Sequence, residues 1–189
     1  MPSPEKPSPS TALRFSLHEP LPAALSVAEG LEAYLQENGF DRALYDAAWT
    51  PASLFGLPVP VPNTKKHRFA IMRHDLHHVA TGFGTDPVGE AEISAWEARR
   101  GFGRIGLYTT GIVSGLVLLG LVLNPKRTVA ALKSGGRGTR NLFAGEVPYE
   151  TLLGWTIGEL RSHLGLPEGG IAGARKLHEK APARVETVT

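Results

Sequence analysis

Residues 65–100 read KKHRFAIMRHDLHHVATGFGTDPVGEAEISAWEARR, and they predict two helices joined by a tight turn. The first helix ends at Gly82, because glycine readily takes the backbone conformation that closes a helix. In the loop TGFGTD, Asp86 precedes Pro87, which is the usual order of a capping residue and a proline at the first helical position. The second helix therefore starts at Pro87, stops at Gly101 and folds back beside the first.

Four residues of this stretch predict a metal site between the two adjacent helices. His74 and His78 differ by about 40° around the first helix and stack one turn apart, which suits two imidazoles on one cation. Asp75 lies on the flank of the same face, where it either ligates the metal or orients a histidine. Glu90 lies about one turn into the second helix and faces the imidazoles. The predicted ligands are His74, Asp75, His78 and Glu90.

The donor types restrict which metal the site would take. The chain has no cysteine, which excludes thiolate ligands and disulfides. Nitrogen and oxygen donors with open positions suit a divalent ion, with Zn²⁺ as the first choice and Fe²⁺ or Mn²⁺ as alternatives. The competing interpretation is an exposed, histidine-rich helix face without a ligand. His77 points about 100° away from His78, so we expect it to pack or to be solvated.

The segment before these helices is helical at first and then rich in proline. Ser26 and Glu29 form a capping box that predicts a helix over 27–38. A short helical stretch is expected at 41–49. Between 50 and 63 four prolines exclude a regular helix and a central strand. No long alternating strand appears in the chain.

The segment after these helices contains an apolar run from Ile105 to Leu123 without a charged residue. Its glycines thin one side of the predicted helix, and GIVSG is a small-xxx-small motif. Three interpretations remain open: a buried core helix that lines a groove for a lipid tail, a helix at the membrane surface, and a membrane span at the lower length limit. A last helix is predicted over 157–164, with Thr156 and Glu159 as its capping box.

These elements predict an all-α fold with a single helical domain over 12–166. Residues 1–11 are expected to be a disordered tail that is neither a signal nor a transit peptide, and residues 167–189 a loose C-terminal tail. The net charge is only +2, and no segment interleaves basic and aromatic residues, so nucleic acid is not an expected partner.

Several blocks of the sequence resemble the ubiquinone (coenzyme Q) biosynthesis protein 4 family. The spacing from His74 to Glu90 is similar to the HDxxH-x11-E metal signature of that family. LEAYLQENGFD resembles its N-terminal helix and turn, HDLHHVATGFGTDPVGE its central block, and VPYETLLGWTIGELRSHLGL its C-terminal block. The likeness extends from about Leu31 to Leu166. The sequence differs at His77, where an aromatic residue is common in the family, and around GFGRIGLYTTG.

The resemblance implies a function in ubiquinone biosynthesis. The ligand would be a polyprenylated aromatic lipid, and the reaction a metal-dependent decarboxylation that replaces the ring C1 carboxylate with hydroxyl. Asp75 and Glu90 are the residues to which we assign catalytic roles. The expected partners are the other ubiquinone-biosynthesis enzymes and a membrane touched peripherally from the cytoplasm; homo-oligomerisation stays open.

Two other functions compete with this one. A metal-stabilised scaffold that binds a prenyl lipid and recruits partners would use the same groove without catalysis. A zinc hydrolase of the zincin type would need a general base where this chain has Asp75, which reaches less far than glutamate, and an edge strand to hold a peptide. Phosphohydrolases of the HD type need further histidine and aspartate ligands than one HD pair supplies.

Overall fold

The computed structural model describes residues 20–54, 57–136 and 138–172. The predicted tail at 1–11 lies outside the described residues, as do 173–189. The elements follow one another as α1 (Val27–Glu37), the 3-10 turn η1 (Arg42–Tyr45), β1 (Trp49–Leu54), β2 (Leu57–Pro62), α2 (Lys65–Thr81), α3 (Pro87–Arg100), α4 (Gly106–Leu123), α5 (Pro125–Ser134), the 3-10 turn η2 (Leu142–Ala144), α6 (Tyr149–Leu153) and α7 (Ile157–Leu164).

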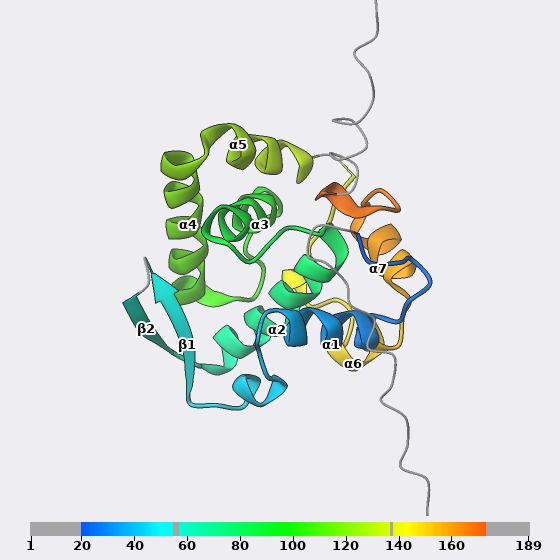
Figure 1. The fold of residues 1–189 in the computed structure, drawn as a ribbon, viewed down its shortest axis with the longest axis horizontal. Coiled ribbons are helices and arrows are strands. Elements are labelled where there is room, and N and C mark those ends of the chain that lie inside the picture. Colours follow the sequence, from blue (N-terminus) through cyan, green and yellow to red (C-terminus); the bar gives the residue numbers. More distant parts are fainter. Residues whose placement is uncertain (1–19, 55–56, 137, 173–189) are drawn as a thin grey trace, which may run out of the picture.

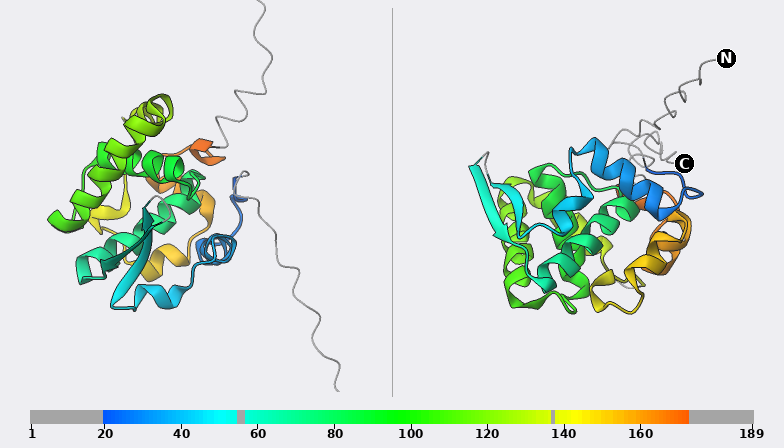
Figure 2. Two further views of the ribbon diagram at one scale, coloured as in Figure 1. Left: turned by 60° about the vertical axis from the view of Figure 1, so that its left-hand side comes forward. Right: turned by 90° about the horizontal axis from the view of Figure 1, so that it is seen from below.

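Helices α2 and α3 form the centre of an all-α domain, as the sequence predicted (Figure 1). Helix α3 packs against α4 and α5, which cover its outer side. Helix α2 packs against α1 and α7 on the opposite side of the domain. The hairpin of β1 and β2 projects at one edge, near α4 (Figure 2). The α2–α3 pair is therefore enclosed between two groups of helices.

The helix boundaries follow the capping residues of the sequence. The Thr64 hydroxyl accepts the backbone N–H of His67 at the start of α2. The Asp86 carboxylate accepts two backbone N–H groups at the start of α3, with Pro87 in the first turn. The predicted capping boxes of α1 and α7 are both present. These local bonds satisfy N–H groups that a helix start leaves without a partner.

Residues 41–62 differ from the prediction. Helix formation stops at Tyr45, and the chain continues as an antiparallel hairpin in which Thr50 pairs with Val61 and Pro51 with Pro60. In a two-stranded sheet both strands are edges, so the prolines can direct their missing N–H away from the ladder. The exclusion of a central strand agrees with this hairpin, but the helix expected to residue 49 ends at Tyr45, and the hairpin itself was not predicted.

The core gathers apolar side chains from α1, α2, α3 and α7. Leu31, Leu76, Ile93 and Leu160 are fully buried and belong to one cluster. Ile171 also packs in this cluster, beyond the last helix that the sequence predicted. A smaller cluster joins α2 and α4 to η2 and contains Ala70, Ile105, Val113 and Phe143. Both clusters include side chains of α2.

Helix α4 is the one helix, within the described residues, that is long and apolar enough to cross a membrane by length and composition. Its mean hydropathy is 1.9, yet only 17% of it is buried. Thr109, Val113 and Gly120 face inward, whereas Leu107 and Val122 are 89% and 80% exposed. Of the three interpretations, a fully buried helix fits this exposure least well: α4 lies at the edge of the domain, with one packed face.

Candidate metal centre

The return loop between α2 and α3 determines where Glu90 lies. Gly82 ends α2 in the left-handed conformation with φ of 74°. At Gly89 a Cβ atom would lie 2.2 Å from the carbonyl oxygen of Gly84, so backbone meets backbone at this point. Only glycine permits such an approach without a shift of the chain. The tight turn brings the next residue, Glu90, against His74 and His78 of α2.

Three side chains converge on one point between these helices. The Nε2 atoms of His74 and His78 are 3.1 Å apart. Glu90 places one carboxylate oxygen 3.2 Å from Nε2 of His74 and the other 3.4 Å from Nε2 of His78. Ligands about 2.1 Å from a tetrahedral zinc ion lie about 3.4 Å from each other. His74, His78 and Glu90 form a group that could hold a metal ion.

The hydrogen bonds behind the histidines set the state of their free nitrogens. Nδ1 of His78 lies 3.0 Å from the carbonyl oxygen of Phe83, which can only accept, so Nδ1 carries the proton. Nδ1 of His74 lies 2.9 Å from a carboxylate oxygen of Glu97. In the neutral imidazoles each Nε2 then presents a lone pair toward the other. Two acceptors and a carboxylate this close require a proton or a cation between them.

The electrostatics of the group favour positive charge. Burial alone would lower the pKa of His74, but Glu97 and Glu90 outweigh it and hold the pKa well above the usual value. Burial likewise opposes ionisation of Glu90, yet His78 and His74 lower its pKa. A metal ion would replace the proton that otherwise satisfies these groups. The residues therefore fit a divalent cation in charge as well as in spacing.

Glu97 is a part of the site that the sequence analysis missed. Its side chain is fully buried, and one oxygen contacts Nδ1 of His74 at 2.9 Å and Nδ1 of His77 at 2.7 Å. Although burial opposes it, the two histidines lower the pKa of Glu97 to about 2. Glu97 follows Glu90 by seven residues, or about two helical turns, so both occupy one face of α3. The seven-residue spacing from Glu90 is the sequence signal from which Glu97 could have been predicted.

His77 is buried and packs, which is one of the two roles expected for it. Its ring contacts Trp96 and Phe143 edge to face. Nε2 accepts the backbone N–H of Leu142 at 2.9 Å, so Nδ1 carries the proton and donates it to Glu97. Burial lowers the pKa of His77. The residue is thus a neutral link between α2, α3 and η2.

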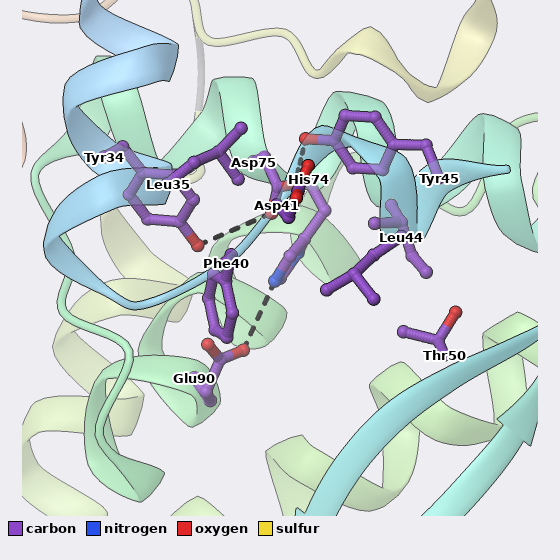
Figure 3. Close-up of a pocket in the computed structure, with 11 residues that line it drawn as sticks. Tyr34, Leu35, Phe40, Asp41, Leu44, Tyr45, Thr50, His74, Asp75 and Glu90 are labelled. Carbon is purple, nitrogen blue, oxygen red and sulfur yellow. Dashed lines mark hydrogen bonds and ion pairs between the residues drawn. The ribbon is translucent and has the colours of Figure 1, made fainter. Parts of the chain in front are cut away.

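Asp75 is separate from the metal group, although the sequence analysis counted it as a ligand. Its carboxylate accepts hydrogen bonds from the hydroxyls of Tyr45 and, at 3.4 Å, Tyr34 (Figure 3). Burial raises the pKa of Asp75. Burial and Asp75 together also raise the pKa of both tyrosines, so both phenols keep their protons. The structure brings together His74, His78 and Glu90, and it directs Asp75 toward two tyrosines.

Two cavities meet at His74 and Glu90. The first, here the tyrosine cavity, is about 220 Å³ and is also lined by Tyr34, Phe40, Tyr45 and Asp75 (Figure 3). The second, here the apolar cavity, is about 210 Å³, and its further lining is mainly Val61, Ala70, Ile112, Val113, Leu116 and Phe143. Ile71 lines both. The candidate metal position thus lies at the junction of a cavity that carries several polar side chains and one that is almost wholly apolar.

Comparison with known proteins leaves this geometry as the basis for assigning a function. No model of a known protein family, no curated protein and no solved structure matches the chain.

Proposed function

We propose that this protein is a zinc-dependent enzyme of ubiquinone biosynthesis that acts on a polyprenylated benzenoid acid. It would remove the ring C1 carboxylate and leave a hydroxyl in its place. The observation that carries the proposal is the position of the His74, His78 and Glu90 group between the tyrosine cavity and the apolar cavity. A benzenoid head and an isoprenoid tail need these two environments on either side of one reacting carbon.

The hydrogen bonds around the group support the binding of a cation. Phe83 fixes His78, and Glu97 fixes His74, so both rings are oriented before any ion arrives. Bound zinc would act as a Lewis acid toward a ring carboxylate or an adjacent oxygen. Glu90 would balance its charge, and it is only partly buried and lines both cavities. Asp75 adds a second carboxyl group in the tyrosine cavity, where it orients the phenols.

The reaction must balance outside the chain. Carboxylate and water give hydroxyl, carbon dioxide, one proton and two electrons, so an external two-electron acceptor such as dioxygen is required. In this proposal the chain's own task is to bind and orient the acid. The apolar wall of α4 at Ile112, Val113 and Leu116 would hold the apolar part of the ligand.

A long prenyl tail would extend beyond the apolar cavity. The cavity of about 210 Å³ has room for only one or two isoprene units, and α4 continues from its wall to an exposed apolar face. Leu107, Leu118 and Val122 lie on that face, with Arg104 and Lys126 exposed at the helix ends. We propose that this face touches a membrane peripherally from the cytoplasmic side, where the lipid substrate and the other biosynthetic enzymes would meet the protein.

The test is a single incubation of zinc-loaded protein with a prenylated 4-hydroxybenzoate labelled in its carboxyl carbon, with dioxygen present. Release of the label as carbon dioxide, absent with His78→Ala, is the expected result. Tight binding without release would instead favour the lipid-binding scaffold, which the same two cavities would suit. Neither binding nor release would contradict both. The zincin alternative is weaker, because Asp75, which stands where that class has its general base, is engaged by two tyrosines.

A further inference from the structure

The tyrosine cavity has an unusual arrangement of polar groups on its wall. Tyr34 comes from α1 and Tyr45 from η1, and both direct their hydroxyls to the Asp75 carboxylate of α2 (Figure 3). The Tyr45 bond is the shorter of the two, and Asp75 is only 7% exposed. The neighbouring elements α1 and η1 therefore meet α2 in one hydrogen-bonded group beside the metal position.

These bonds determine what the phenols can offer to a ligand. A phenol has one proton to donate and two lone pairs to accept. Asp75 takes the proton of Tyr45, so the Tyr45 oxygen is left as an acceptor. A group that enters the cavity and meets this oxygen must donate a hydrogen bond. An ether or a bare ring carbon at the same place leaves a buried acceptor without a partner, which is costly.

The size and walls of the cavity favour one aromatic ring. A buried apolar cavity of about 150 Å³ holds a benzene molecule, so about 220 Å³ holds a substituted benzene ring. Phe40 and Tyr34 supply aromatic surface, and the Tyr34 ring stacks on His78 with centroids 5.3 Å apart. A ring between these walls would have one end at His74 and Glu90 and another part of its edge near Tyr45.

We propose that Tyr45, held by Asp75, selects ligands whose aromatic ring carries a hydroxyl group that donates to the Tyr45 oxygen. Tyr45 is then a specificity-determining residue, and Asp75 a positioning residue rather than a metal ligand. The inference rests on the proposed function, since it assumes that an aromatic carboxylate reaches the metal. It adds a requirement that the metal group alone does not impose: hydroxybenzoates are accepted in preference to benzoates and to their methyl ethers.

The experiment is an NMR titration of the zinc-loaded full chain with benzoate, with 3- and 4-hydroxybenzoate, and with the two matching methoxybenzoates. One hydroxybenzoate should bind about fivefold to tenfold more tightly than benzoate and than its own methyl ether, as one net hydrogen bond predicts. Tyr45→Phe should abolish that preference. Tyr108→Phe is the control, because Tyr108 lies on α4, is largely exposed and does not line the tyrosine cavity.

The outcomes separate this inference from the proposed function. Equal affinity for benzoates and hydroxybenzoates overturns the role of Tyr45 and leaves carboxylate binding at the metal intact. Tight binding of a methyl ether shows that Tyr45 donates, which also overturns it. Binding of none of the acids overturns the proposed function as well. If Tyr45→Phe does not fold, the comparison of hydroxyl with methyl ether in the wild-type protein decides alone.

Discussion

Helices α2 and α4 depart in opposite directions from the usual separation of polar and apolar side chains. Helix α2 is polar on average, yet its buried side chains include three histidines, an arginine and an aspartate. Helix α4 contains no charged residue, yet Leu107, Leu118 and Val122 are strongly exposed. Isolated exposed leucines are ordinary, but a whole apolar face is not. The buried polar side chains of α2 therefore indicate a bound ligand, and the exposed apolar face of α4 indicates an external apolar partner.

The two helices differ in which groups contact these side chains. Around α2 the protein itself supplies partners: Glu97 bridges two histidines, and two tyrosines hold Asp75. The exposed face of α4 has no such partner among the described residues, and only an external apolar phase would cover it. We therefore expect that changes near α2 affect folding and metal binding, and that changes on the outer face of α4 affect association alone.

The largest effect is expected from Glu97→Ala. This change removes one member of a buried network and leaves His74 and His77 without their acceptor, so the free energy of unfolding should fall by about 3–5 kcal/mol. Chemical denaturation monitored by circular dichroism measures it. The exposed Glu146→Ala is the control and should change stability by less than about 0.5 kcal/mol. A loss as small as that for Glu97→Ala would show that the network does not support the fold.

Loss of a ligand should affect the metal more than the fold. His78→Ala removes one of the three converging donors, and we expect zinc affinity to fall by at least about a hundredfold, the upper range for loss of a supporting contact. Competition with a chromophoric chelator measures the affinity. Asp75→Asn, by contrast, should keep zinc affinity within about tenfold, because Asp75 is not among those donors. Equal losses in the two variants would contradict the separation of Asp75 from the metal group.

The two faces of α4 can be separated with one pair of alanine variants. At Gly120 a Cβ would lie 2.4 Å from the Cβ of Ala91, so Gly120→Ala should cost about 1–3 kcal/mol through overpacking. At Gly115 nothing lies within 4 Å, so Gly115→Ala should be neutral or stabilise by up to about 1 kcal/mol. Thermal unfolding of both proteins tests this. A destabilised Gly115→Ala would mean that the outer face is packed.

The smallest effect should appear only in the presence of lipid. Serine at both Leu118 and Val122 should leave stability within about 0.5 kcal/mol, because both side chains are exposed. Binding to anionic vesicles should nevertheless weaken by roughly fivefold to tenfold, through lost apolar contact. Cosedimentation with vesicles of phosphatidylcholine and phosphatidylserine measures it. Unchanged sedimentation would argue against membrane contact through α4.

Much of the fold could be predicted because its signals are local. Capping residues and glycine stops located α1, α2, α3 and α7, and these signals depend on bonds within a few residues. The hairpin at Trp49–Pro62 was missed because its prolines argue against a regular strand, whereas an isolated pair of strands has only edges and tolerates them. The exposure of α4 could not be predicted either, because composition alone does not distinguish a core helix from one covered by an external partner.

The part of the site that depends on helical spacing could be predicted from the sequence. His74, His78 and Glu90 followed from one helix face and one tight turn. Asp75 was assigned to the same group because it lies on the flank of that helix face, whereas its carboxylate is held by tyrosines from α1 and η1. Contacts between residues 30 and 41 positions apart, such as these, leave no pattern in a single sequence.

The link from His74 through Glu97 and His77 to the backbone N–H of Leu142 makes one amide group a reporter on the metal centre. The donor and the acceptor of its last bond lie 65 residues apart. Because that amide is buried in a hydrogen bond to an imidazole, its exchange with deuterium requires this part of the fold to open. Exchange at Leu142 should therefore slow when zinc is added. The exchange rate of this one amide would then report on ion binding at a site that it does not contact directly.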